Sequence, residues 1–318
     1  MLVTTSTGRL LAAMAAVALW STNAFAADVA LSQMGLGWLL LIQFSSAAAA
    51  LLAVRAVRAV QARSGFGPAP DVADSGAWQW DYAAILIGVV GLTGTMSLQY
   101  LAFATAPIVA ANVLAYGWPL LAAVWLAATI RSRHTLVSAG LALLGFLGIA
   151  LIFTGPSQAT DDPIAGAGLP WGYLAALGSA ACMAIYTLGV SRRPATAATT
   201  LLIPATLAGT AAAVLVLVLG GGAAPTGTGV VVAAYLGLGP MAAGYALWTR
   251  AMSRGGAERL SPLGYATPLL STGLLLATGA PATSATVLGV GLVLGCSLGV
   301  LAYDRYVNRC ARGSRDTA

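Results

Sequence analysis

Charged side chains are scarce in this sequence of 318 residues: Asp, Glu, Lys and Arg together account for 8% of it, whereas 59% of the residues are hydrophobic. Soluble globular domains carry about 25% charged residues. The composition therefore excludes a soluble globular domain and is typical of an integral membrane protein.

Lysine is absent, and the 15 basic residues are arginines scattered among the breaks between apolar stretches. No basic stripe alternates with stacking aromatic residues, so the formal charge of +6 does not predict nucleic-acid binding. The three cysteines, Cys182, Cys296 and Cys310, argue against a disulfide framework. The single histidine, His134, lies beside arginines in a loop, and the sequence predicts neither a metal ion nor a cofactor.

Carboxylates are missing from the interiors of the apolar stretches. All nine acidic residues fall in predicted loops, in the C-terminal tail or at predicted helix ends. Intramembrane Asp, Glu or Lys usually marks a proton relay or a site for a charged substrate. The same stretches contain no pair of carboxylates and no Ser/His/Asp set, so an enzyme is not predicted. These absences favour a pathway for a small solute without net charge, either neutral or zwitterionic.

Long apolar runs are what the sequence does contain. A membrane-spanning helix needs about 20 mostly apolar residues, and these runs are too uniformly apolar for the alternating strands of a barrel. The sequence predicts an all-α integral membrane protein with ten transmembrane helices in contact with lipid. The predicted spans are 8–27, 34–54, 82–102, 106–129, 135–154, 170–190, 197–219, 228–249, 257–279 and 284–304.

The arginines predict the orientation of these helices, because cytoplasmic loops of membrane proteins are enriched in basic residues. If the N-terminus is cytoplasmic, every arginine falls on the cytoplasmic side and the outer loops carry only Asp28, Asp161 and Asp162. We therefore predict a multi-pass plasma (inner) membrane protein with both termini in the cytoplasm.

The first apolar run also has features of a cleavable signal peptide: Arg9, the run 10–19, and Ala24-Phe25-Ala26 as a small-residue cleavage site. The residues at 20–23 (Trp-Ser-Thr-Asn) are not typical of a signal peptide that is cleaved and removed. Cleavage would also leave an odd number of spans. We therefore interpret this run as a retained helix.

One ten-residue pattern occurs twice, at 112–121 and again at 261–270, 149 residues later, with five identical positions. The repeat divides the chain into two five-helix halves, residues 1–160 and 161–318. Because five is an odd number, the halves are predicted to cross the membrane in opposite directions. Inverted repeats of this kind are typical of transporters whose binding site lies near the membrane midplane.

Prolines and uncharged polar groups provide the candidate site. Pro119 and Pro268 fall near the middle of their spans, where proline disfavours a straight helix, and are predicted hinges. Amides and phenols can bind the carboxylate and ammonium groups of a solute while aromatic rings stack on its side chain. The alternative for each ring is simple packing between helices. The predicted binding residues are Trp20, Asn23, Gln99, Tyr100, Asn112, Tyr116, Trp118, Tyr186, Tyr245, Trp248 and Tyr265.

Ten helices in two inverted halves, with cytoplasmic arginines and proline-centred fourth and ninth helices, resemble the drug/metabolite transporter (DMT) superfamily with EamA-type repeats. Within it the chain is more closely similar to the YddG-type aromatic amino-acid exporters. The motifs that carry this closer likeness are Ala18-Leu19-Trp20-Ser21-Thr22, Tyr116-Gly117-Trp118-Pro119, Gly244-Tyr245-Ala246-Leu247-Trp248 and Tyr265-Ala266-Thr267-Pro268.

One generic feature of the superfamily is absent. Many members carry Gly-Glu just after helices four and nine, where this chain has Ala128-Thr129-Ile130-Arg131 and Gly279-Ala280-Pro281. That departure is itself similar to the YddG type.

The resemblance implies export of aromatic and other neutral amino acids through a central cavity lined by both halves. Because no proton acceptor is predicted within the spans, we expect no strict proton coupling. Two alternatives remain open: an exporter of other small neutral metabolites or apolar drugs, and a non-transporting channel or scaffold. Glycines in the fifth and tenth spans suit close helix packing, and the oligomeric state stays open.

Overall fold

The structure is a computed structural model. Its regular elements are helices throughout the described part of the chain, in which no strand occurs. This confirms the predicted all-α class. The described residues are 6–64, 82–129, 137, 140–141, 144–145, 147–148, 151, 171–191, 198–220, 222–252, 263–264, 266–279, 284–285, 287–296, 298–299 and 302–303.

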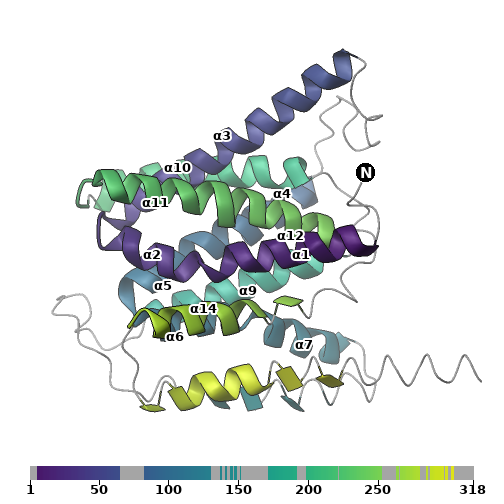
Figure 1. The fold of residues 1–318 in the computed structure, drawn as a ribbon, viewed down its shortest axis with the longest axis vertical. Coiled ribbons are helices and arrows are strands. Elements are labelled where there is room, and N and C mark those ends of the chain that lie inside the picture. The colour runs from purple at the N-terminus through teal and green to yellow at the C-terminus, as the bar shows by residue number, and fades with distance from the viewer. Residues whose placement is uncertain are drawn as a thin grey trace, which may run out of the picture.

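The helices follow one another along the chain, several of them as consecutive pieces of one run (Figure 1). Their bounds are α1 Ser6–Ser21, α2 Asn23–Leu31, α3 Leu36–Arg63, α4 Tyr82–Gly88, η3 Val89–Gly94, α5 Thr95–Thr105, α6 Ile108–Ala115, α7 Trp118–Thr129, α9 Trp171–Ser191, α10 Ala198–Gly220, α11 Gly227–Leu236, η4 Gly237–Gly244, α12 Tyr245–Met252 and α14 Ala266–Ala277.

Six helical runs are long and apolar enough to cross a membrane, and they coincide with six of the predicted spans. They are Thr7–Leu31, Leu36–Gln61, Tyr82–Thr105, Trp171–Val190, Thr200–Gly220 and Gly227–Met252. Shorter apolar helices, Ile108–Ala122, Ala266–Ala277 and Val287–Cys296, fall inside the predicted spans 106–129, 257–279 and 284–304. The predicted span 135–154 lies mostly outside the described residues. The chain is an integral membrane protein, and the count of ten spans stays a prediction.

Helix packing joins segments that are far apart in the sequence (Figure 1). The long helices α3 and α10 lie against each other. The run α1–α2 packs on α11, η4 and α12, while α9 packs on α4, η3 and α5. In addition, α3 contacts α11 and η4, and α10 contacts α4 and η3. Each of these contacts joins a helix of the predicted N-terminal half to a helix of the predicted C-terminal half, so the two halves share one core.

Two runs contain a π-helical segment in the middle, η3 within Tyr82–Thr105 and η4 within Gly227–Met252. Glycines let neighbouring backbones approach these segments closely. A Cβ atom at Gly88 would meet the backbone carbonyl of Leu201, and one at Gly237 would meet the backbone carbonyl of Gln43. Small residues of this kind favour close helix packing in membranes, and π-segments occur frequently at functional sites.

The predicted hinge prolines both lie in the first turn of a described helix. After α6 the chain turns at Tyr116–Gly117, and Pro119 is the second residue of α7. Pro268 is the third residue of α14. Proline is tolerated in the first turn of a helix, because the backbone N–H there has no partner within the helix. An interruption therefore lies next to Pro119, and the hinge role of both prolines stays a prediction.

One end of the bundle collects described arginines. α1 begins, and α3 and α12 end, on the right in Figure 1, and these ends carry Arg9, Arg63 and Arg250. At the opposite end the turn between α2 and α3 lies against the link between α10 and α11, where Gly35 N–H donates to the Ala223 carbonyl at 3.0 Å. The side of the membrane that each end faces stays a prediction.

Candidate functional site

Buried aromatic rings form a continuous row across four helices. Trp118 of α7 contacts Trp248 of α12, with ring centroids 6.1 Å apart, and Trp248 contacts Trp20 of α1 at 5.2 Å. Trp20 and Tyr245 are 5.3 Å apart, and Tyr245 and Tyr186 of α9 are also 5.3 Å apart. Most pairs meet edge to face, the geometry that the ring quadrupole favours. The row brings together five of the predicted binding residues, drawn from both halves.

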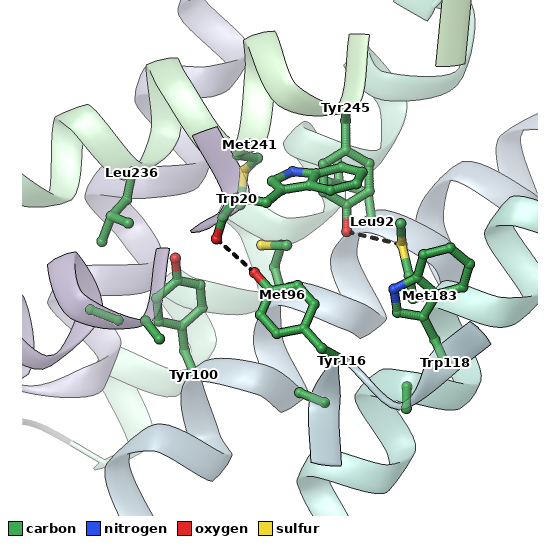
Figure 2. Packing of buried hydrophobic residues seen from close by; sticks show 14 of the residues in the cluster. Trp20, Leu92, Met96, Tyr100, Tyr116, Trp118, Met183, Leu236, Met241 and Tyr245 are labelled. Atoms are coloured by element: carbon green, nitrogen blue, oxygen red, sulfur yellow. Dashed lines mark hydrogen bonds between the residues drawn. The ribbon is translucent and has the colours of Figure 1, made fainter. Parts of the chain in front are cut away.

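Trp20 is held at both its ring and its backbone. Its indole Nε1–H donates to the Pro240 carbonyl at 2.9 Å, and its own carbonyl accepts from the Tyr116 hydroxyl at 2.9 Å (Figure 2). The Trp20 carbonyl is available because α1 ends at Ser21. Gly244 gives the indole room, since a Cβ atom there would lie 2.7 Å from Trp20 Nε1.

A chain of buried hydrogen bonds lies across α2, α3 and α5. The Tyr100 hydroxyl donates to Asn23 Oδ1 at 2.6 Å and accepts from Gln43 Nε2 at 2.9 Å. Asn23 Nδ2 donates to Gln99 Oε1 at 3.3 Å. Tyr116 lies beside Asn23 and Gln99, which connects this chain to the aromatic row. The predicted residues Asn23, Gln99, Tyr100 and Tyr116 therefore lie together.

Asn112 has different partners from the other predicted residues. Its Nδ2 donates to Thr272 Oγ1 at 3.3 Å, and its Oδ1 accepts from Ser271 Oγ at 3.2 Å. Both partners belong to α14. The helices that carry the two copies of the repeated pattern are thus in direct contact, through side chains buried between them.

Tyr186 is fixed by a glycine and a threonine. Its ring lies where a Cβ atom of Gly91 would be, and its hydroxyl shares a 2.7 Å hydrogen bond with Thr249 Oγ1. Thr249 also hydrogen-bonds to the carbonyl of Tyr245, one turn earlier in α12. Thr249 and Gly91 were not among the predicted binding residues.

Several further members of the cluster are absent from the list of predicted binding residues. Gln43 stands out as an amide in an apolar run, a signal that could have placed it in the site. Met96 and Met183 accept weak hydrogen bonds from Gln43 and Tyr245, at 3.8 Å and 3.7 Å, and nothing in an apolar run distinguishes such methionines. Of the predicted residues, Tyr265 lies outside the described part of the chain.

The chemistry of the cluster is uncharged. Phenols, indoles, amides, hydroxyls and thioethers can bind both donors and acceptors without attracting a net charge. Among the described residues no group of three His, Cys, Asp or Glu side chains could hold a metal ion.

Comparison with known proteins identifies the family. The model of the EamA-like transporter family matches residues 7–154 and 170–302. The chain belongs to the EamA-like transporter family. This confirms the resemblance to EamA-type members of the DMT superfamily, and membership in a transporter family points to a transporter rather than an enzyme.

Two further proteins are similar to this EamA-like protein, one in sequence and one in structure. The aromatic amino acid exporter YddG of Ancylobacter novellus is 31% identical over 210 residues, which cover 65% of this chain and 72% of that protein. A solved crystal structure aligns with 95% of this chain and 99% of its own chain, with a TM-score of 0.64 and 24% sequence identity. The second likeness shows that the fold is shared.

Proposed function

We propose that this EamA-like protein exports aromatic and other neutral amino acids from the cytoplasm across the inner membrane. The observation that carries the proposal is the buried row of rings from Trp118 to Tyr186, bordered by the amides of Asn23 and Gln99. Rings stack on an aromatic side chain, and amides bind carboxylate and ammonium groups. The relative from Ancylobacter novellus supports it, since its name gives aromatic amino acids as its cargo.

The proposed architecture is ten helices in two inverted five-helix halves, residues 1–160 and 161–318. It is supported by the family model, whose two matched stretches lie on either side of residue 160. The packing supports it too, because the partners correspond when the halves are exchanged. α1–α2 lies against α11, η4 and α12 as α9 lies against α4, η3 and α5, and the π-segments take equivalent places.

Transport in this proposal is by alternating access. In the present structure most of the ring and amide groups contact one another, so a bound solute must separate them and take over their contacts. The 3.3 Å contact between Asn23 and Gln99 is one of the longer amide hydrogen bonds of the cluster, and a solute replaces it at low cost. Pro119 lies in the first turn of α7, which follows α6, and Pro268 lies in the first turn of α14, which contacts α6. In this proposal the two prolines let these helices move as separate pieces.

The proposal is tested by exchange in proteoliposomes that contain each of the twenty amino acids in turn. We expect phenylalanine, tyrosine and tryptophan to exchange fastest and acidic and basic amino acids slowly. Trp118→Ala, Tyr245→Ala and Tyr265→Ala should each reduce exchange of the bulky solutes while inserting normally into the membrane. Unchanged exchange in all three variants contradicts a solute path along this cluster.

The same assay separates the alternatives. Exchange restricted to apolar drugs or to other metabolites would favour a different cargo, and flux that neither saturates nor responds to counter-substrate would favour a channel.

An imposed pH gradient tests the energy source. We expect it to leave the final amino-acid distribution unchanged, whereas uphill accumulation driven by the gradient contradicts transport without strict proton coupling.

A further inference from the structure

Thr95 and Tyr245 occupy the same position relative to the two π-segments. Thr95 is the first residue after η3 and begins α5, and Tyr245 is the first residue after η4 and begins α12. One comes from each half of the chain, yet both contact α9 one turn apart. The Thr95 carbonyl accepts from Ser179 Oγ at 2.9 Å, and the Tyr245 hydroxyl donates to the Met183 sulfur. Thr95 and Tyr245 are 4% and 1% exposed, so neither side chain is in contact with bulk solvent.

The polar atoms at this meeting point are poorly satisfied. The Tyr245 hydroxyl donates to the thioether sulfur of Met183 at 3.7 Å (Figure 2), and a thioether is a weak acceptor. The Thr95 hydroxyl has no hydrogen-bond partner among the described residues. Buried polar groups are almost always paired, so an unpaired one calls for an explanation such as a missing ligand.

A third donor lies one turn away on the same helix. Trp248 follows Tyr245 by three residues in α12, a spacing that places both on one face. Both rings also contact the indole of Trp20. Trp248 is fully buried, and its Nε1–H has no partner among the described residues. An indole N–H can only donate, so this group requires an acceptor.

We propose that Thr95, Tyr245 and Trp248 bind the carboxylate of the transported amino acid. The inference rests on the proposed function and adds which end of the bound solute these residues hold. Hydrogen bonds from neutral donors to a carboxylate are stronger than those to neutral acceptors, and Tyr245 would exchange a thioether sulfur for a carboxylate oxygen. The solute carries its own ammonium group, so the site needs no charged side chain to remain neutral overall.

Of the three residues, Thr95 offers the sharpest test because it does not belong to the aromatic row. Thr95→Val removes the hydroxyl and keeps the shape, and Thr95→Ser keeps the hydroxyl. Thr206→Val is the matched control, since Thr206 is equally buried but its hydroxyl is already bonded to carbonyls of its own helix. Trp248→Phe removes the indole N–H and retains an aromatic ring.

The measurement is counterflow of labelled phenylalanine in proteoliposomes. Thr95→Val and Trp248→Phe should each raise the half-saturating concentration about tenfold, the loss expected for one hydrogen bond to a charged group. Thr95→Ser and Thr206→Val should stay within about twofold of the parent protein. The maximal rate should change less than the half-saturating concentration, because the missing contact affects binding.

Two competitors identify the end of the solute that is bound. 3-Phenylpropionate has the carboxylate without the ammonium group, and 2-phenylethylamine has the reverse. Thr95→Val should weaken inhibition by 3-phenylpropionate about tenfold, again the effect of one charge-assisted bond, and leave inhibition by 2-phenylethylamine unchanged. Equal weakening of both competitors, or no weakening of either, overturns the assignment. One of these results is also expected if a buried water, rather than the solute, satisfies these groups.

Failure of this inference is distinguishable from failure of the proposed function. If the parent protein exchanges phenylalanine and Thr95→Val does so with unchanged half-saturation, only the carboxylate site is wrong. Binding of phenylalanine to the purified full-length protein, measured by calorimetry, gives a second readout that does not depend on flux. Binding weakened by Thr95→Val supports the site, and absence of binding in the parent protein overturns both proposals.

Discussion

The Tyr116 hydroxyl donates a 2.9 Å hydrogen bond to the backbone carbonyl of Trp20, and each of these residues lies where a helix ends. Trp20 is next to the last residue of α1, and Tyr116 follows the last residue of α6. A break in a membrane helix frees backbone groups, which must find partners in the absence of water. One break here supplies the donor for the other, so the two interruptions stabilise each other.

Tyr116→Phe should destabilise the protein by about 1–3 kcal/mol, because it leaves the buried Trp20 carbonyl without its donor. The measurement is the midpoint of thermal unfolding in detergent, which should fall. Tyr235→Phe is the matched control. The Tyr235 hydroxyl also makes a hydrogen bond, to Thr22 Oγ1 at 2.6 Å, but Thr22 Oγ1 still donates to the Leu19 carbonyl when the phenol hydroxyl is removed. Equal shifts for the two variants would contradict this account.

Asn23 and Tyr100 should be energetically coupled, because the Tyr100 hydroxyl donates to Asn23 Oδ1 at 2.6 Å in a buried chain of bonds. In a double-mutant cycle with Asn23→Ala and Tyr100→Phe, we expect an interaction energy of roughly 0.5–2 kcal/mol in the free energy of unfolding. Denaturation in mixed micelles measures it. Thr278→Val combined with Tyr100→Phe should be additive, since Thr278 bonds only within its own helix. Additivity of the first pair would sink the proposed network.

Gly91→Ala should reduce both folded yield and exchange activity. A Cβ atom at this position overlaps the ring of Tyr186, which in turn contacts Tyr245. Overpacking in a core costs about 1–3 kcal/mol. Gly273→Ala is the control, because a Cβ atom there has no neighbour within 4 Å. The measurements are monodisperse protein recovered per cell and phenylalanine counterflow, and normal values for Gly91→Ala would show that the ring has room to move.

The predicted orientation can be checked with single cysteines in a cysteine-free background. Ser64 follows the last residue of α3 at the arginine-bearing end, and Ser32 lies in the turn between α2 and α3 at the opposite end. Both side chains are exposed. With the N-terminus in the cytoplasm, a membrane-impermeant maleimide should label Ser32→Cys in intact cells. It should label Ser64→Cys only after permeabilisation. The reverse pattern would mean that the arginine-bearing end faces outward.

The helical class and six of the spans were predictable, because membrane helices are specified by the length and hydrophobicity of local runs. The family was predictable from short motifs such as Tyr116-Gly117-Trp118-Pro119, and the comparison with known proteins confirmed it. Ten of the eleven candidate site residues are described. Nine of them pack into one connected region, whereas Asn112 bonds to Ser271 and Thr272 of α14. Their exact binding roles stay predictions.

Local sequence did not predict which helices break or how. Pro119 indicated a disturbed helix, but the turn itself falls at Tyr116–Gly117, because Gly117 N–H bonds to Leu114 and Leu120 N–H bonds to Gly117. The π-segments are also invisible in the sequence beyond an abundance of glycine. Each depends on what packs against it, such as Tyr186 against Gly91.

The sequence by itself determined that the chain is helical, that it is a membrane protein and that the polar side chains within its apolar runs are uncharged. Composition and run length decide these properties, because transfer into lipid depends on each residue almost independently of its neighbours. Only the tertiary structure decided that Thr95 and Trp248 are buried with no hydrogen-bond partner among the described residues and that Tyr245 is paired with a thioether. Hydrogen-bond pairing depends on distances between helices that are remote in the sequence, and no local pattern carries those distances.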